Sequence, residues 1–393
     1  MIDRTQKENK YPKIYLAIDN CFAFKRWTRP KDWAKVIKDL GVNFVEASAD
    51  TELDPLFMGE EYLKGWVEDV KDAEAKYGIK VANLYSGHGT YCTLGLTHTD
   101  EMVRRRMIDK WFKPLIKTAG QLDAGIGFFA HAFADYILQD KSAYDEYIEI
   151  LYTGLTELNA YADEENCGDL GLEQMYSPHQ VPWRIEGTRK LIKEITRRSG
   201  RDFFFTEDVG HHHIKFVKPT EEDVLKAVGT GNGENLWLGT NKAYKMLNDA
   251  VQSKNVSNGV IKSIMNEFED NPQMFARKED GDCYEWLKRL GCYSPIIHLQ
   301  QTDGLSSSHA HFTEENNSKG IISGECLLRA IKESYENNIE DGMPGRCGRI
   351  YLTLEVFTST ASINIETLKD YALSVEYWRK FVPEDGMRLD ELV

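Results

Sequence analysis

The chain has 393 residues, of which 41% are hydrophobic and 11% aromatic, so it is long enough to bury a large core. It carries 63 acidic against 48 basic residues, which gives a formal net charge of -15. This balance opposes non-specific binding to a phosphate backbone, so we expect no nucleic-acid partner. Cysteine is scattered through the chain without a C-x-x-C pair, a usage that suits a reducing compartment.

The sequence shows no sign of export or membrane insertion. Its first residues, MIDRTQKE, are polar and charged, so no signal peptide is expected. No apolar run approaches the roughly 18 residues that a membrane span requires. We therefore expect a cytoplasmic protein that has no membrane partner.

Strand-like and helix-like segments alternate along the first half of the chain. Strands are predicted at 13–18, 43–47, 80–85 and 125–130, and the fifth and sixth strands lead to Glu173 and Asp208. Helices are predicted at 30–40, 60–77, 100–119, 141–165 and 184–199. Such βα alternation predicts an α/β fold with a parallel sheet, which closes into a barrel when eight units repeat.

The alternation breaks once, before the seventh strand starts at Pro295. Turn-rich segments at 230–235 and 255–259 border stretches with a helical pattern at 241–251 and 260–268. We interpret residues 214–282 as an inserted helical segment between strands six and seven, a lid or an oligomer contact, within one domain spanning 1–393. Helices at 285–290, 325–336 and 366–381 then complete the eight units.

Four strand-like segments of the second half each end in a metal-ligand residue. In chain order these residues are Glu173, Asp208, His298 and Glu355. The C-terminal ends of parallel barrel strands meet at one mouth, so the four side chains should converge there. A single carboxylate at a strand end is commonly just solvated, but four such residues in this order predict a common site. Three carboxylates and one imidazole favour one divalent cation, Mn²⁺ first, with Mg²⁺ or Co²⁺ as alternatives.

The order Glu, Asp-x-x-His, His, Glu on strands five to eight resembles the xylose-isomerase-like barrel superfamily of sugar phosphate isomerases and epimerases, closest in style to the ketose 3-epimerases. The likeness covers most of the chain outside the insertion, and the order and spacing of the motifs carry it. It implies a (β/α)8 TIM barrel, a metal held by the four residues, and Glu173 and Glu355 as the acid/base pair. It also implies substrate contacts by His211, which follows Asp208, and by His179, which follows Glu173.

The chemistry of these residue types agrees with that implication. A proton next to a carbonyl is too weakly acidic to leave at neutral pH unless the enediolate is stabilised, which a chelated divalent cation does as a Lewis acid. A positioned carboxylate that transfers the proton adds about 10²–10⁴-fold. We therefore expect a metal-dependent isomerase or epimerase whose partner is a small carbohydrate or its phosphate.

Other polar and aromatic residues are expected near the same mouth. The candidates for substrate contacts are Trp27 after strand one, His88 after strand three, His131 at the end of strand four, and His311 in the loop after His298. Asp19, Asn20 and Arg26 could also wall a sugar pocket, and Glu46 could support the metal ligands. Each of these residues taken alone has an equally good structural explanation.

Histidines are clustered at 211–213 and at 309 and 311, and the alternation of side chains along an extended segment predicts which of them face the site. Successive residues point to opposite faces, so within 211–213 only His211 is assigned to the site. His309 and His311 share a face if their segment is extended, and they could then reach a substrate or a second metal. No arginine occurs in 299–312, where some epimerases of this type keep one that orients the substrate.

Three other functions fit parts of the pattern. A multinuclear metal hydrolase, like an apurinic endonuclease of the same superfamily, would recruit His88 and His131, although the negative net charge opposes DNA binding. A carbon–carbon or C-glycoside lyase acting on a keto-sugar would use the same metal and base beside a small partner subunit. A sugar sensor has no use for this ligand set. The apolar helices of the insertion need cover, so we also expect a homo-oligomer, either a dimer or a tetramer.

Overall fold

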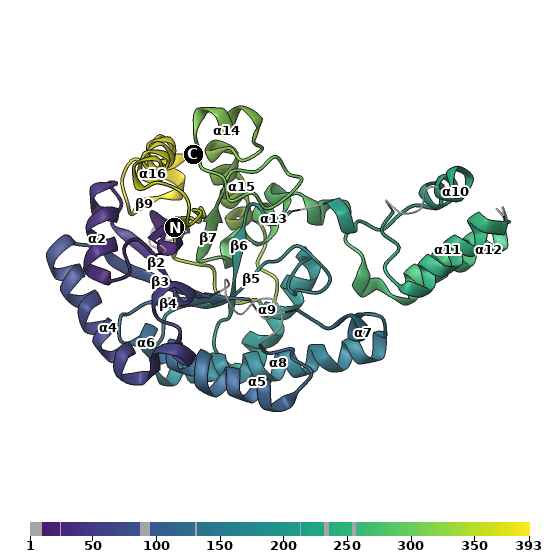
Figure 1. Cartoon of the computed structure of the whole chain (residues 1–393), viewed down its shortest axis with the longest axis horizontal. Helices are drawn as coiled ribbons and strands as arrows, with labels where there is room; N and C mark the ends of the chain where they lie inside the picture. Colours follow the sequence, from purple (N-terminus) through teal and green to yellow (C-terminus); the bar gives the residue numbers. More distant parts are fainter. Residues whose placement is uncertain are drawn as a thin grey trace, which may run out of the picture.

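Eight parallel strands form a closed barrel in this computed structural model, which describes residues 10–23, 25–86, 95–129, 132–212, 214–231, 236–253 and 257–393 (Figure 1). The strands are β1 (Lys13–Asp19), β2 (Phe44–Ser48), β3 (Lys80–Ser86), β4 (Gly125–Phe128), β5 (Leu170–Glu173), β6 (Phe204–Asp208), β7 (Ile296–Leu299) and β8 (Arg349–Leu354). Each strand pairs with the next, and β1 pairs with both β2 and β8. The predicted (β/α)8 barrel is therefore confirmed.

Helices surround the strands as the βα alternation predicts. They are α2 (Pro30–Asp39), α4 (Pro55–Tyr77), α5 (Glu101–Met107), α6 (Lys113–Gly120), α8 (Lys141–Glu164), α9 (Ile185–Ser199), α13 (Cys283–Leu290), α15 (Gly324–Glu336) and α16 (Asn364–Arg379). The helix predicted at 60–77 is confirmed, because Gly59, with a φ of 74°, interrupts α4 and separates it from a short helical segment that starts at Pro55, where Asp54 accepts a hydrogen bond from Leu56 N. Gly78, in the left-handed conformation, ends it.

A few short elements were not predicted from the sequence. They are α3 (Ala49–Glu52), α7 (Asp135–Leu138), α14 (Glu314–Lys319), β9 (Met387–Arg388) and α17 (Leu389–Leu392). The two residues of β9 pair antiparallel with the start of β1, at the end of the barrel remote from the mouth. Elements of two to six residues show too little periodicity to be recognised in a sequence.

Besides α13, three helices lie between β6 and β7 in the described residues, namely α10 (Glu221–Thr230), α11 (Asn241–Ser253) and α12 (Asn258–Asp270), and they extend to one side of the barrel (Figure 1). Hydrogen bonds connect the surrounding segment to the loop after β4: Asn241 N donates to Gln139 Oε1 and Gln273 Nε2 donates to Leu138 O. The role of 214–282 as a lid or oligomer contact stays a prediction. In the described part of the chain, no helix is both long and apolar enough to cross a membrane.

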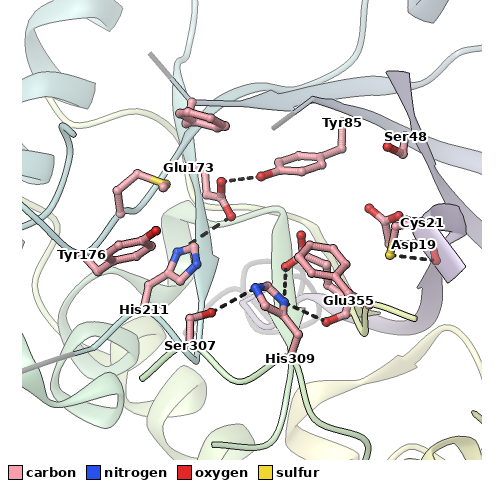
Figure 2. A pocket seen from close by; sticks show the side chains of 13 residues that line it. Asp19, Cys21, Ser48, Tyr85, Glu173, Tyr176, His211, Ser307, His309 and Glu355 are labelled. Carbon is pink, nitrogen blue, oxygen red and sulfur yellow. Dashed lines mark hydrogen bonds and ion pairs between the residues drawn. The ribbon is translucent and has the colours of Figure 1, made fainter. Parts of the chain in front are cut away.

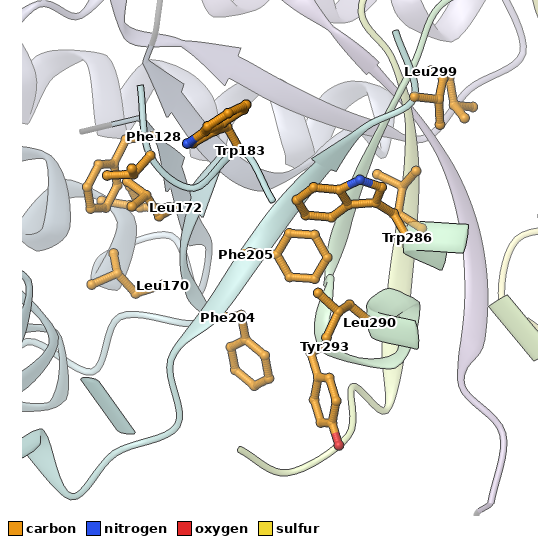
Figure 3. Close-up of a cluster of buried hydrophobic side chains, with 14 of the residues drawn as sticks. Phe128, Leu170, Leu172, Trp183, Phe204, Phe205, Trp286, Leu290, Tyr293 and Leu299 are labelled. Atoms are coloured by element: carbon orange, nitrogen blue, oxygen red, sulfur yellow. The ribbon is translucent and has the colours of Figure 1, made fainter. Parts of the chain in front are cut away.

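The core between the barrel and its outer helices positions the strands that carry the site (Figure 3). Phe205 of β6 and Trp286 of α13 are both fully buried, with ring centroids 6.3 Å apart. The Trp286 indole also donates a hydrogen bond to Asp280 O at 2.9 Å. Because side chains alternate along a strand, Phe205 faces outward while its neighbour Thr206 faces the barrel interior.

We expect Phe205→Ala to lower the free energy of unfolding by about 3–5 kcal/mol, because it leaves a cavity against Trp286. Phe57→Ala is the matched control, since the Phe57 side chain is 86% exposed and its loss should change stability by about 0.5 kcal/mol or less. Urea denaturation followed by tryptophan fluorescence measures both variants. Equal losses in the two would contradict the packing described for β6.

Candidate active site

The four predicted metal ligands lie together at the C-terminal mouth of the barrel. Glu173 and Asp208 are the last residues of β5 and β6, His298 is in β7, and Glu355 directly follows β8. One ligand atom of each residue lies within 4.8 Å of those of the others, and all four residues are buried. The backbone fixes this proximity, because Asp208 is directly opposite His298 in the β6–β7 register and Glu355 N donates to Leu299 O.

His298 stands at the centre of this cluster. Its Nε2 lies 2.9 Å from Glu46 Oε2, while its Nδ1 lies 3.2 Å from Glu173 Oε1 and 3.3 Å from Glu355 Oε2. If Nε2–H donates to Glu46, the free Nδ1 lone pair faces two carboxylate oxygens, an arrangement that a cation between them stabilises. Glu46, which also accepts a hydrogen bond from Asn83, therefore orients the imidazole.

The charges of this cluster are unbalanced without a cation. Burial raises the pKa of Glu355 well above its usual value, against the attraction of His298. Although burial lowers it, the negative charges of Glu355 and Glu46 raise the pKa of His298 well above its usual value. Glu355 Oε2 is also buried, and no described residue forms a hydrogen bond with it. A divalent cation would take the place of protons here, and three oxygens with one nitrogen suit Mn²⁺, Mg²⁺ or Co²⁺.

Asp208 is held as a charged carboxylate by several donors. Gly210 N donates to its Oδ1 at 2.7 Å, and Gln300 Nε2 lies 2.9 Å from Oδ1 and 3.1 Å from Oδ2. His211 Nε2 lies 3.3 Å from Oδ2. Although burial raises it, the nearby His211, His309 and His298 lower the pKa of Asp208 to about 2. Its negative charge at neutral pH is what a metal ligand requires.

Glu173 is supported by a tyrosine that the sequence did not point to. Tyr85, near the end of β3, donates a short hydrogen bond to Glu173 Oε2. Burial and the charge of Glu173 raise the pKa of Tyr85 well above its usual value, so its hydroxyl keeps the proton and remains a donor. The other oxygen of Glu173 is the one that faces His298. Glu173 is therefore fixed in orientation on both sides.

A cavity of about 330 Å³ opens beside the cluster (Figure 2). Glu173, Glu355 and His211 line it, whereas Asp208 and His298 are fully buried behind it. Its less polar walls are Phe129, Met175, Tyr176 and Phe357, and its further polar residues are Asp19, Cys21, Ser48, Tyr85, Ser307 and His309. Both candidate acid/base carboxylates thus face the space in which a small molecule would sit.

The structure brings only some of the predicted substrate contacts to this cavity. His211 lines it, and its Nδ1 is fixed by Gln174 O at 2.8 Å. His212 turns away to Glu207, as the alternation rule predicts. His88 and His131 lie outside the described residues, and so does His213.

Three of the predicted contacts do not line the cavity, and for these the prediction needs correction. His179 is held by Phe133 O at 3.0 Å, and Trp27 packs on Phe22 with ring centroids 5.8 Å apart. Both side chains are half-buried among loop residues rather than in the cavity. Each was assigned from its distance along the chain after a strand, which does not determine where a loop side chain points.

The third correction concerns His311, whose place in the cavity is taken by His309. His311 Nδ1 lies 3.3 Å from Ser374 Oγ, and its ring packs against Tyr371. His309 lines the cavity and stacks on Phe357 with ring centroids 3.9 Å apart. The reason is the backbone of His309, whose φ of 43° is left-handed, so the segment is not extended and the two histidines do not share a face.

The family model described as xylose isomerase-like TIM barrel matches residues 34–231, about half of the chain. The chain belongs to this family. A curated relative, the D-erythrulose 1-phosphate 3-epimerase of Brucella abortus (strain 2308), is 22% identical over 275 residues, which are 69% of this chain and 68% of the relative.

Solved structures share the fold. A Rhodospirillum rubrum protein described as a candidate xylose isomerase superposes with a TM-score of 0.66 at 17% identity, covering 93% of this chain and 99% of that one. The D-psicose 3-epimerase of Clostridium cellulolyticum H10 superposes with a TM-score of 0.51 at 12% identity, covering 94% and 98%. At these identities the likeness establishes the barrel architecture alone.

The contact between Glu46 and His298 gives a prediction for metal binding. We expect Glu46→Gln to weaken Mn²⁺ binding by about 10–100-fold, because the carboxylate that orients the imidazole is lost. Isothermal titration with MnCl₂ measures the dissociation constant. Glu60→Gln, an exposed glutamate of α4, is the control and should bind Mn²⁺ like the unmodified protein. Unchanged affinity in Glu46→Gln would contradict the role given to Glu46.

Proposed function

We propose that the protein is a divalent-metal-dependent epimerase or isomerase of a sugar or sugar phosphate, working by proton transfer next to a carbonyl group. The observation that carries this proposal is that Glu173 and Glu355 both line the cavity beside the four-residue cluster. They come from β5 and from the end of β8, so they approach a bound molecule from different sides. Inversion at carbon requires that one group removes the proton and another returns it to the opposite face.

Glu173, Asp208, His298 and Glu355 are the residues that would hold the cation, which when bound supplies positive charge against the negative charge developing on the substrate oxygens. Asp208 and His298, both fully buried, serve only as ligands in this proposal. Glu173 and Glu355 have the double role of ligand and proton-transfer group. The two pairs differ because Glu173 and Glu355 line the cavity, whereas Asp208 and His298 do not.

The neighbours of the two carboxylates suit them to proton transfer. Tyr85 donates to Glu173 Oε2, and therefore stabilises the ionised form that accepts a proton. Glu355 Oε2 lies 3.3 Å from His298 Nδ1 and 3.7 Å from His309 Nδ1, so ring nitrogens surround the carboxylate at the edge of the cavity. In this proposal one of the two carboxylates removes the proton and the other returns one to the opposite face, with the roles exchanged in the reverse direction.

Aromatic walls shield the space between the two carboxylates. Phe129 and Tyr176 line it on the β4–β5 side, and Phe357 stacks on His309 over the β7–β8 side. His211, fixed by Gln174 O, presents its ring to the same space and could contact a substrate oxygen. Exclusion of water matters here because an intermediate that has lost a proton could otherwise be protonated directly by water on either face.

The names of the relatives support the same reaction class. The curated relative is a 3-epimerase of a ketose phosphate, and the Clostridium cellulolyticum structure is a 3-epimerase of a free ketose. Both names describe inversion next to a ketone, which is the chemistry that two opposed carboxylates perform. The identity of the metal as Mn²⁺, a homo-oligomeric assembly, the cytoplasmic location and the lid role of 214–282 remain part of this proposal.

Deuterium exchange tests the proposal. The Mn²⁺-loaded protein is incubated in D₂O with tetroses, pentoses, hexoses and their phosphates, and NMR detects deuterium next to the carbonyl. We expect incorporation into at least one ketose, and Glu173→Gln or Glu355→Gln should slow it by at least about 10²-fold because a proton-transfer group is lost. Glu60→Gln should exchange at the unmodified rate.

Three results would redirect the assignment. Full exchange in Glu355→Gln would refute its part in proton transfer. Two or more metal ions per chain would favour the multinuclear hydrolase. Exchange with no free sugar, together with release of the leaving group from a keto-glycoside, would favour the lyase.

A further inference from the structure

A buried carboxylate outside the metal cluster also faces the cavity. Asp19 is the last residue of β1, is 1% exposed, and lines the cavity together with Glu173 and Glu355. Its Oδ1 accepts a hydrogen bond from Cys21 N at 2.6 Å, which fixes the direction of the carboxylate. The proposed proton transfer does not use Asp19. Buried polar groups normally have hydrogen-bond partners. Since Asp19 faces the cavity and has no part in the proton transfer, we look for its role in binding the substrate.

The cavity offers no fixed positive charge near Asp19. None of the described residues that line it is a lysine or an arginine. Arg26, in the loop after β1, instead donates to Ser359 O and Ser362 O at 2.9 and 2.7 Å, joining that loop to the one after β8. The stretches that the structure leaves undescribed after β3 and β4 read GHGTYCTL and AH, also without lysine or arginine.

The surroundings of Asp19 already disfavour negative charge. Burial and the nearby Glu46 raise the pKa of Asp19 to about 7. A site that resists the ionisation of one carboxyl group also resists the entry of a further anion. Even one divalent cation would leave the carboxylates of Glu173, Asp208 and Glu355 in excess of its charge. A phosphate group on this side of the cavity would therefore meet repulsion.

Asp19 does not stand alone on its side of the barrel. Ser48, the last residue of β2, lines the same side, and its backbone N–H is held by Asn20 Oδ1 at 2.7 Å. Both lie across the cavity from Tyr176 and His211, as Figure 2 shows and as the strand order requires. A carboxylate accepts hydrogen bonds, and a serine hydroxyl both donates and accepts, so the pair suits a sugar hydroxyl.

We propose that Asp19 and Ser48 form a subsite for a free hydroxyl group of the sugar and that this subsite excludes a phosphate ester, so that the substrates are unphosphorylated sugars. This inference rests on the proposed function. A sugar hydroxyl can both donate to and accept from Asp19, whereas a phosphate dianion brings negative charge into a space lined by Asp19, Glu173 and Glu355 and by no lysine or arginine among the described residues. This chain would then differ from its Brucella abortus relative, whose name specifies a phosphorylated ketose.

Binding of matched pairs tests the subsite. The Mn²⁺-loaded protein is titrated with D-fructose and D-fructose 6-phosphate, D-ribulose and D-ribulose 5-phosphate, and erythrulose and erythrulose 1-phosphate, and calorimetry or ligand-detected NMR gives each Kd. For every pair that binds, we expect the ester to bind at least about tenfold more weakly than the free ketose. Asp19→Asn keeps the shape but removes the charge, and should reduce this ratio to about threefold or less.

The control is Asp135→Asn, which removes an exposed carboxylate at the start of α7, after β4, outside the cavity lining. It should keep the unmodified ratio, whereas a shift equal to that of Asp19→Asn would assign the preference to net charge and overturn the subsite. If phosphate esters bind the unmodified protein as tightly as the free ketoses, the subsite is refuted without any variant. The test therefore remains decisive even if Asp19→Asn folds poorly.

Binding separates this inference from the proposed function. Preferential binding of free ketoses without deuterium exchange would contradict the enzymatic proposal and leave the subsite standing. Exchange into phosphorylated ketoses alone would contradict the subsite and leave the enzymatic proposal standing. Binding of no sugar in any pair would contradict both.

Discussion

The crowding of three carboxylates and one imidazole in a buried space is the constraint on which the site depends. Glu173, Asp208 and Glu355 cannot all be ionised within a few ångströms of one another, out of water, unless positive charge lies among them. In the structure the pKa values of His298 and Glu355 are both raised, so protons bound to these two groups offset part of the negative charge. A divalent cation offsets it with ionised ligands, and the same positive charge is what a reaction through an oxyanion needs.

The barrel imposes this crowding, and it also determines which groups are free to react. Parallel strands bring their C-terminal ends to one mouth, but the register decides how deep each side chain lies. Asp208 and His298, opposite each other on neighbouring strands, are completely enclosed. Glu173 and Glu355 lie at the edge of the cavity. The proposed division into metal ligands and proton-transfer groups therefore rests on depth in the barrel.

Residues with no metal contact shape what the cavity can accept. Glu46 and Tyr85 orient His298 and Glu173, and they come from β2 and β3, across from the strands that carry the ligands. Asp19 and Ser48 add an acidic and hydroxylic side at the ends of β1 and β2. The strands β1 to β3 thus add supporting and acidic groups to a cavity whose candidate metal ligands come from β5 to β8.

The sequence by itself determined the barrel, the order of its strands and the four clustered ligands, because strand periodicity and a polar residue at each strand end are local features. It also separated His211 from His212, since alternation holds there. Tertiary structure decided which loop side chains reach the cavity. His309 replaces His311 because one left-handed residue changes the direction of the loop. Trp27 packs on Phe22 within its own loop, and His179 is held by Phe133 O of a distant loop, so neither reaches the cavity. Tyr85 and the burial of Asp19 depend on contacts between distant strands, which no local pattern encodes.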